Sequence, residues 1–431
     1  MSVNEKLFEF ISESPTAFHA VATASGMLDH AGFTGLDESK QWDLVPGGKY
    51  YITRNGSSLI AFRMPEDGSY PGYMMTSSHS DSPSFKIKEN AEEAREGYMR
   101  LSIEGYGGML CAPWFDRPLS VAGRITVRNN MGFSSVNVDL KKPVALIPSV
   151  AIHMNRKIND ESSYNVARDM QPLFRDEKGS SCSLKKLVSD ASGVPESDIL
   201  STDLFLYDPE KGVEWGDYIS SPRLDDLQCV FSCLTGFLKA KPSDSVPVLC
   251  LFDNEEVGNG TRQGAESTIL RDTLDRIEDS FHLTRSERNT KIANSFMLSC
   301  DNSHAVHPSH PEYKDPNHCP HANRGIVIKL AASQKYTTDA ISSSVVKLLC
   351  EKADVPYQYY ANRADIPGGS TLGNISATKV PVCTADIGLA QFAMHSIFET
   401  AGAKDTGYLI KLITLFYEKT ARFTPDGMEL R

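Results

Sequence analysis

The sequence predicts an α/β protein in which a mixed, largely parallel sheet forms one domain and a β-rich domain is inserted into it. Beyond Asp217, short apolar strands alternate with amphipathic helices, a pattern typical of parallel strands covered by helices. Between about residue 85 and residue 217 the chain alternates polar and apolar residues between turn residues, which favours antiparallel strands. We therefore expect residues 1–84 and 218–431 to form the α/β domain and residues 85–217 to form the inserted domain.

Each element of the α/β domain is predicted from its own spacing and boundaries. A Ser-Pro start followed by helical spacing predicts a helix over residues 14–33. Short apolar runs bounded by turn residues predict strands, and longer amphipathic runs predict helices. In chain order the strands are expected at 57–64, 70–78, 246–253, 295–300, 325–332 and 380–386. The further helices are expected at 225–240, 266–281 and 338–353, with one or two closing helices over 395–423.

Composition and charge exclude several classes of function. At 431 residues the chain is too long for one ordinary compact core, which favours two domains. Its formal net charge of −11 argues against nucleic acid and anionic membranes as partners. No apolar run approaches the roughly 18 residues of a membrane span, and the N-terminus does not read as a secretory signal. The nine cysteines are scattered without a C-x-x-C pair, as reduced thiols are, so we expect a cytoplasmic protein.

Acidic residues and histidines follow the ends of several predicted strands. In open α/β sheets the functional crevice lies at the carboxyl ends of the strands, so these side chains are expected to converge. They are His79, Asp81, Asp225, Asp226, Asp253, Glu255, Glu256, Asp301 and His395. A set of histidines and carboxylates without cysteine suits zinc, manganese or cobalt better than a structural thiolate site. Two divalent ions would balance the charges of Asp225, Glu256 and Asp301 together with a hydroxide.

The triplet His79-Ser-Asp81 predicts a metal ligand and the residue that orients it. Residues two apart on extended backbone point to the same side, and ligand imidazoles usually donate their second N–H to a carboxylate or carbonyl. Asp81 can therefore hold the His79 ring without binding metal. For the triplet alone, a solvated turn after a strand is the alternative.

Glu255 and Glu256 are adjacent, so their side chains would diverge on a regular helix or strand. Gly258 and Gly260 leave the backbone free to bend. Glu256 can then bind a metal while Glu255 acts as the general base, taking the proton of the attacking water and passing it to the leaving amine. A solvated acidic loop is the alternative.

A histidine-rich stretch follows Asp301, and its Pro and Asn content favours a loop. We expect His304 to contact the substrate and the other histidines to lie at the surface; a separate histidine-rich metal site is the alternative. These other histidines are His307, His310, His318 and His321. His153 lies in the inserted domain, and the sequence alone favours a satisfied histidine at a strand end.

Eight segments resemble, in order, the motifs of the aspartyl aminopeptidase family. They are HSDSP, WFDRPLS, AIHMNR, SPRLDDL, DNEEVGNGTRQGA, DNSHAVHP, IPGGST and DIGLAQFAMHSIFE, and the resemblance spans about Ser14 to Ala421. Within the family the sequence looks like the bacterial aminopeptidase 2 members. The resemblance implies a dinuclear zinc peptidase fold, a catalytic metallopeptidase domain at 1–84 and 218–431, and a dimerisation domain at 85–217.

The resemblance also implies roles for the residues at the strand ends. In sites of this kind the peptide bond after a bridging aspartate is often cis, which singles out Asp225–Asp226. The implied roles are Asp225 as the bridge between two metal ions, His79 and Asp301 at one ion, Glu256 and His395 at the other, and Glu255 as the base.

Self-association is a further implication of the resemblance. His153 matches a histidine that reaches the active site of the partner subunit and helps to hold the substrate and its transition-state oxygen. The family assembly is typically a tetrahedral dodecamer, built from dimers, with an enclosed chamber that admits peptides and excludes folded proteins.

Members of this family differ in whether they remove acidic or neutral N-terminal residues from peptides. Lys329 and Tyr336 match the substrate-contacting lysine and tyrosine of the family, and Met394 can add an apolar wall. A lysine within an apolar strand must face a carboxylate or a cleft. The sequence therefore favours removal of Asp and Glu from peptides with a free N-terminus, with a neutral preference as the alternative.

The sequence does not decide two features of the substrate site. The free α-amine needs an acidic partner, and Asp226, Glu255 and Asp253 are the candidates. Family members often carry a polar or aromatic stretch where this sequence has Met109-Leu110-Cys111, so no family contact is carried over from that loop.

Three functions compete on the sequence alone. A metal-dependent aminopeptidase is favoured, and a dinuclear amidohydrolase or carboxypeptidase would have a similar site. A non-catalytic assembly protein that kept the fold would have lost ligands. Every implied ligand is present here, as is Glu255, which argues against that third function.

Overall fold

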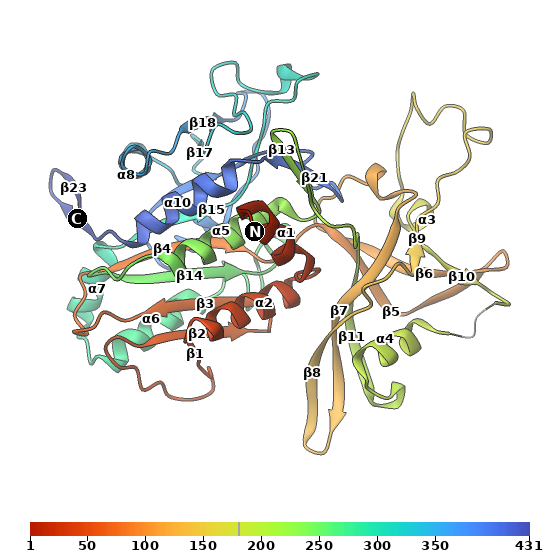
Figure 1. Cartoon of the computed structure of the whole chain (residues 1–431), viewed down its shortest axis with the longest axis horizontal. Helices are drawn as coiled ribbons and strands as arrows, with labels where there is room; N and C mark the ends of the chain where they lie inside the picture. The colour runs from red at the N-terminus through yellow and green to blue at the C-terminus, as the bar shows by residue number, and fades with distance from the viewer. Residues whose placement is uncertain (180–181) are drawn as a thin grey trace.

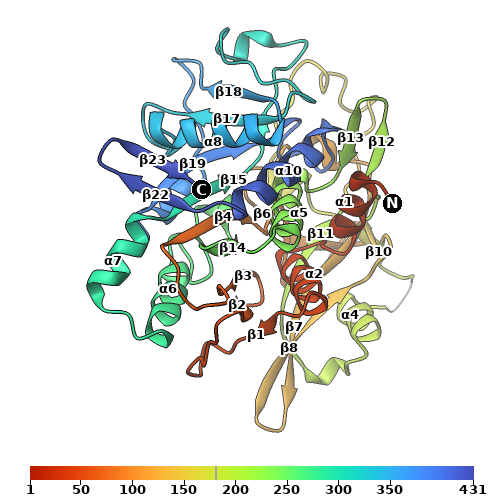
Figure 2. The same cartoon turned by 60° about the vertical axis from the view of Figure 1, so that its left-hand side comes forward.

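Two large sheets lie side by side in the computed structural model, which describes residues 1–179 and 182–431 (Figures 1 and 2). The first is a nine-stranded mixed sheet with helices on both faces, and its four central strands run parallel. In spatial order its strands are β1 (Thr34–Gly35), β2 (Lys49–Arg54), β3 (Ser58–Arg63), β14 (Val246–Phe252), β4 (Tyr73–His79), β15 (Phe296–Cys300), β19 (Cys383–Gly388), β17 (Ile326–Leu330) and β18 (Tyr357–Ala361).

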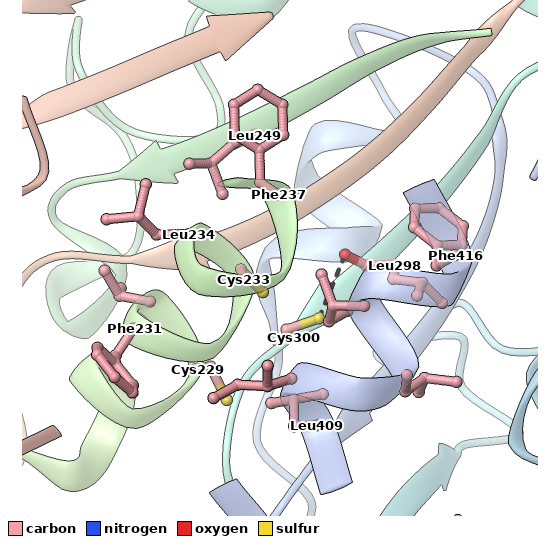
Figure 3. Packing of buried hydrophobic residues seen from close by; sticks show 14 of the residues in the cluster. Cys229, Phe231, Cys233, Leu234, Phe237, Leu249, Leu298, Cys300, Leu409 and Phe416 are labelled. Atoms are coloured by element: carbon pink, nitrogen blue, oxygen red, sulfur yellow. Dashed lines mark hydrogen bonds between the residues drawn. The ribbon is translucent and has the colours of Figure 1, made fainter. Parts of the chain in front are cut away.

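Helices cover both faces of this sheet because its central strands are apolar on both sides. Every residue of β4 and of β14 is buried. Since successive side chains alternate between faces, Leu249 packs in one core cluster and Cys250 in the other. Figure 3 shows Leu249 and Leu298 facing side chains of α5 and α10. The helices of this part of the chain are α1 (Val3–Ser12), α2 (Ala17–His30), α5 (Leu224–Lys239), α6 (Ile269–Ser280), α7 (Arg285–Ala293), α8 (Ala340–Ala353), α9 (Leu372–Ser376) and α10 (Asp405–Tyr417).

The second large sheet has seven strands and a core of its own (right-hand side of Figure 1). Its strand pairs are antiparallel, as the alternating polar and apolar residues predicted. In spatial order they are β11 (Ile199–Tyr207), β5 (Ser84–Arg95), β6 (Tyr98–Tyr106), β10 (Leu173–Asp176), β9 (Ala145–Leu146), β7 (Pro118–Asn129) and β8 (Gly132–Asp139). Two helices accompany them, α3 (Val166–Asp169) and α4 (Leu184–Ser192).

A smaller five-stranded sheet joins distant parts of the chain near the boundary of the two large ones. It brings β13 beside β21, so that Tyr218 pairs with Gly402 and Ser221 with Glu399. Its strands are β12 (Val213–Trp215), β13 (Tyr218–Ser221), β21 (Glu399–Gly402), β20 (Ala390–Phe392) and β16 (Ser303–His304). A hairpin of β22 (Ala421–Thr424) and β23 (Gly427–Leu430) ends the chain.

The mixed α/β architecture predicted from the sequence is confirmed, but the prediction of closing helices from residue 395 onward is wrong in part. Residues 399–402 form β21, and the closing helix begins only at Asp405. Pairing with β13 outweighs local helix propensity there, since tertiary contacts routinely override it. His395 also has a φ of 65°, a left-handed conformation that no helix can contain.

Candidate metal centre

The predicted ligands meet where the carboxyl ends of three neighbouring strands reach the seven-stranded sheet. His79 is the last residue of β4 and pairs with Phe252 at the end of β14. Asp301 follows β15, which lies on the other side of β4. Because these strands are parallel and adjacent, their ends deliver side chains to one place.

Two further loops close the centre from outside this strand array. Asp225 lies at the start of α5, directly after the five-stranded sheet, and its peptide bond to Asp226 is cis. His395 lies in the turn between β20 and β21. Three groups of side chains have potential ligand atoms within 4.8 Å of one another: His79 with Asp225, Asp226 and Asp301; His79 with Glu255 and Glu256; and Asp225 with Glu256 and His395.

The two carboxylate oxygens of Asp225 face two different histidines. Oδ1 lies 3.4 Å from Nε2 of His79, and Oδ2 lies 3.5 Å from Nε2 of His395. Nε2 of His395 also lies 3.4 Å from Oε2 of Glu256. Asp225 thus stands between two groups of potential ligands, a position from which one carboxylate can serve both.

Main-chain carbonyls orient both imidazoles. Nδ1 of His79 lies 3.0 Å from the carbonyl oxygen of Asp81, and Nδ1 of His395 lies 2.8 Å from the carbonyl oxygen of Gly108. A hydrogen bond at Nδ1 leaves Nε2 as the atom that faces the centre, as in most histidine ligands. Gly108 lies directly before Met109-Leu110-Cys111, and its contact here needs no side chain.

The carboxylate of Asp81 holds the turn that carries the two glutamates. It accepts hydrogen bonds from the backbone N–H of Glu255 and of Glu256, both at 3.2 Å, and from the hydroxyl of Tyr106 at 2.7 Å. Asn254 begins this turn with a φ of 62°. The carboxylate of Asp81, predicted to orient the His79 ring, thus contacts the turn, and the ring lies closer to the carbonyl of Asp81 at 3.0 Å than to its carboxylate at 3.4 Å.

Glu399 is a residue of the site that the sequence did not single out. Its buried carboxylate accepts hydrogen bonds from the backbone N–H of Asp225 at 2.9 Å and of His395 at 2.7 Å. It thereby fixes two loops that are distant in sequence. No local pattern marks it, because it lies in a segment predicted as a helix.

Several carboxylates of the centre are buried close to one another. Burial, reinforced by neighbouring carboxylates, raises the pKa of Glu255 to about 7 and that of Glu399 to about 8. Burial opposes ionisation of Asp225 too, but the nearby imidazoles of His395 and His79 outweigh it and lower the pKa of Asp225. Its Oδ1 and the Oδ1 of Asp226 are buried without a hydrogen-bond partner among the described residues. Unsatisfied carboxylate oxygens beside two oriented imidazoles fit divalent metal ions.

A cavity beside the centre brings together the four residues predicted to bind substrate. His304, Lys329, Tyr336 and Met394 line it along with the potential ligands, and so does Glu255. Asp226 and Asp253, the other two candidates for the α-amine, are buried and do not line this cavity.

Lys329 is already paired within this cavity. Its buried Nζ donates to the carbonyl oxygen of Asn302 at 2.8 Å and lies 3.5 Å from Oδ1 of Asp301. Burial favours the neutral amine, but the charge of Asp301 outweighs it and raises the pKa of Lys329. The lysine is therefore a cation with one carboxylate beside it.

His153 lies far along the chain from any of these loops, in the exposed segment between β9 and α3 that projects from the seven-stranded sheet (Figure 1). It does not line the cavity of its own chain. Two histidines of the 304–321 stretch make local contacts: His310 lies 3.0 Å from Glu312, and His318 lies 2.8 Å from Asp315.

Comparison with known proteins decides the family. A family model described as Aminopeptidase I zinc metalloprotease (M18) matches residues 10–417. The chain belongs to the M18 family. This confirms the resemblance read from the motifs, and it makes the protein a metalloaminopeptidase, a hydrolase that acts on peptide bonds.

Relatives of this M18 aminopeptidase match over nearly their whole length. A Clostridium novyi protein named "Probable M18 family aminopeptidase 2" is 43% identical over 426 residues, which cover 96% of this chain and 98% of the relative. A Pseudomonas aeruginosa protein with the same name is 38% identical over 427 residues, with the same coverage.

Solved structures match the fold equally well. The structure of the Ape4 and Nbr1 complex superimposes with a TM-score of 0.93 at 32% identity, covering 96% of this chain and 85% of the other. Yeast aminopeptidase 1 (Ape1) gives a TM-score of 0.85 at 29% identity, covering 96% of both chains.

Among the described residues, no helix combines the length and the apolar character that crossing a membrane requires.

Proposed function

We propose that this M18 enzyme holds two divalent metal ions and removes N-terminal residues from peptides, with a preference for Asp and Glu. The observation that carries the proposal is the position of Asp225, whose two oxygens face the Nε2 atoms of His79 and His395. One carboxylate between two groups of potential ligands is the arrangement that a dinuclear centre needs.

The potential ligands divide into two groups around Asp225. His79 and Asp301 would hold one ion, and Glu256 and His395 would hold the other, with Asp225 shared. The family model is that of a zinc metalloprotease, so zinc is the first choice. Manganese and cobalt accept the same nitrogen and oxygen ligands.

When bound, such ions polarise a scissile carbonyl and lower the pKa of a water molecule. Glu255 is the chain's own group for proton transfer. Its carboxylate lies with His79 and Glu256 in one group and borders the cavity. It would accept a proton from the attacking water at a carboxylate oxygen and deliver that proton to the nitrogen of the leaving amine. Asp81 supports this role by fixing the backbone of Glu255.

Substrate selection is proposed to depend on residues that line the cavity together with the ligands. Lys329 and Tyr336 offer a cation and a hydroxyl to an acidic side chain, while His304 and Met394 bound the space. A site built to pair a charge rejects substrates that lack the partner. A preference for neutral N-terminal residues remains the alternative, because Lys329 already has Asp301 beside it.

Self-association is part of the same proposal. Residues 85–217 would form the dimerisation domain, and residues 1–84 with 218–431 the catalytic domain. His153, on its exposed segment, would reach the centre of a partner subunit. One structural neighbour is described as the mApe1 dodecamer of S. cerevisiae, at 29% identity and a TM-score of 0.85. A tetrahedral dodecamer built from dimers and located in the cytoplasm is the assembly that we propose.

Hydrolysis after metal exchange tests the proposal. The protein is stripped with a chelator, reloaded with zinc, manganese or cobalt, and offered peptides that begin with Asp, Glu or Leu. We expect the stripped protein to be inactive and the reloaded protein to cleave the acidic peptides fastest. N-acetylated copies of the peptides should stay intact; their cleavage would instead favour an amidohydrolase or a carboxypeptidase.

A further inference from the structure

A second hollow lies next to the cavity of the metal centre. His304, Tyr360 and Gly369 line both spaces, so the two hollows share a wall. Beyond that wall the second hollow is bordered by Lys314 and Arg363. Two basic residues therefore lie in the hollow adjacent to the cavity of the metal centre.

The two basic residues of this second hollow differ in their partners. Nε of Arg363 lies 2.8 Å from Oδ1 of Asp365, so the charge of Arg363 is already paired. Nζ of Lys314 instead lies 4.5 Å from the centroid of the Tyr360 ring. Burial lowers the pKa of Lys314 to about 8; the charge of Cys319 opposes this shift, and no carboxylate contributes to it.

Lys314 also differs from Lys329 in the first cavity. Lys329 has Asp301 at 3.5 Å and the carbonyl of Asn302 at 2.8 Å. The half-buried ammonium of Lys314 has an aromatic face on one side and, among the residues that the structure describes, no carboxylate partner. A cation–π contact stabilises an ammonium only modestly and leaves it able to accept a carboxylate. Lys314 is thus the basic group of these two hollows whose charge the described chain leaves uncompensated.

We propose that Lys314 binds a carboxylate of the peptide substrate and is a specificity-determining residue of this enzyme. The inference rests on the peptide hydrolysis at the metal centre proposed above and adds a second cation to the one supplied by Lys329. Two parts of a substrate carry the required group: the side chain of an N-terminal Asp or Glu, and the C-terminal carboxylate of a short peptide. A neutral group would leave the ammonium unpaired, so Lys314 discriminates against it.

Replacement of Lys314 with methionine tests the assignment. Methionine keeps a long apolar side chain against Tyr360 while it removes the charge. Four substrates are compared with the zinc-loaded enzyme: Asp-Ala-amide, Glu-Ala-amide, Leu-Ala-amide and Leu-Ala with a free carboxyl terminus. We expect Lys314→Met to lower kcat/KM about ten- to hundredfold for the substrates whose carboxylate Lys314 binds, mainly through KM. Leu-Ala-amide should be cleaved as fast as by the unchanged enzyme.

Two further variants serve as controls. Lys314→Arg keeps the charge and should restore most of the lost kcat/KM. Lys347→Met removes a lysine whose Nζ lies 5.2 Å from the ring of Tyr359, the neighbour of Tyr360 on β18, but which borders neither hollow. It should leave all four substrates unaffected.

The pattern of losses identifies the source of the carboxylate. Loss confined to the Asp and Glu amides assigns Lys314 to the N-terminal side chain, and loss confined to free Leu-Ala assigns it to the carboxyl terminus. An equal loss on all four substrates, or no loss on any, overturns the proposal. If the unchanged enzyme cleaves none of the four, the aminopeptidase function itself is wrong, and that result is independent of Lys314.

Discussion

The carboxyl end of the nine-stranded sheet and the edge of the seven-stranded sheet contribute to the same centre in different ways. The first supplies ionisable side chains on buried strand ends and tight turns, among them His79, Asp301 and Glu256. The second contributes two hydrogen-bonding groups, the carbonyl of Gly108 and the hydroxyl of Tyr106, which contact an imidazole and a carboxylate of the centre. One region thus provides several of the potential ligands and the other provides contacts to a ligand and to a turn, so variants in the two regions should differ in effect.

The largest effect is expected at Asp225, which lies between the two groups of potential ligands. Asp225→Asn keeps the size of the side chain but removes the charge between the two histidines. We expect metal content to fall and kcat/KM to drop by far more than the roughly hundredfold typical of a residue that only orients a ligand. Elemental analysis of the purified protein and peptide hydrolysis measure the two effects.

A matched control for this substitution is Asp275→Asn on α6, whose carboxylate lies at the surface 3.8 Å from Arg271. It should change neither metal content nor turnover. An Asp225→Asn protein with the normal metal content would show that the charge of Asp225 is not needed to hold the ions.

The next largest effect is expected at Glu255, which the proposal treats as a base and not as a ligand. Glu255→Gln should keep the metal content and lose about two to four orders of magnitude in turnover, as removal of a general base does. The comparison with Asp225→Asn then separates proton transfer from metal binding. Cleavage of dipeptides at the normal rate by Glu255→Gln would remove the assigned role.

His153 should show an effect only through assembly, because it lies outside the cavity of its own chain. In the fully assembled protein, His153→Phe should lower kcat about a hundredfold, the scale of losing one hydrogen-bond donor to a transition-state oxygen. Size-exclusion chromatography with light scattering establishes the assembly state before kinetics are measured. An assembled variant with unchanged kinetics would mean that His153 has no part in catalysis.

The smallest effect is expected at Tyr106, which belongs to the orienting region. Tyr106→Phe removes the hydroxyl that donates to Oδ2 of Asp81 at 2.7 Å and leaves the ring in place. We expect roughly a tenfold loss in kcat/KM or in metal affinity, the lower end for an outer hydrogen-bond partner. A loss as large as that of Glu255→Gln would contradict a purely orienting role of Tyr106.

Residues on strand ends could be predicted from the sequence because two local signals coincide there. The apolar run of β4 ends at His79, and that of β15 ends just before Asp301, so the position and the chemistry of each side chain are visible in a short window. The alternation of strands and helices then predicts that the two ends are close together.

Residues that depend on long-range pairing could not be predicted in the same way. Glu399 reaches the site because β21 pairs with β13, some 180 residues earlier in the chain, and its own segment suggests a helix. The carbonyl of Gly108 carries no side-chain signal at all. Lys314 lies in a loop whose path is fixed by distant contacts, so its place beside Tyr360 becomes visible only in three dimensions.

The central claim is that Asp225 is shared by two metal ions, and metal stoichiometry tests it most directly. Zinc is titrated into the stripped protein while bound metal and peptide hydrolysis are followed together. We predict two ions per chain in the unchanged protein and a loss of both high-affinity sites in Asp225→Asn, with hydrolysis rising as the sites fill. Saturation at a single ion, or full activity of the stripped protein, would contradict the shared aspartate.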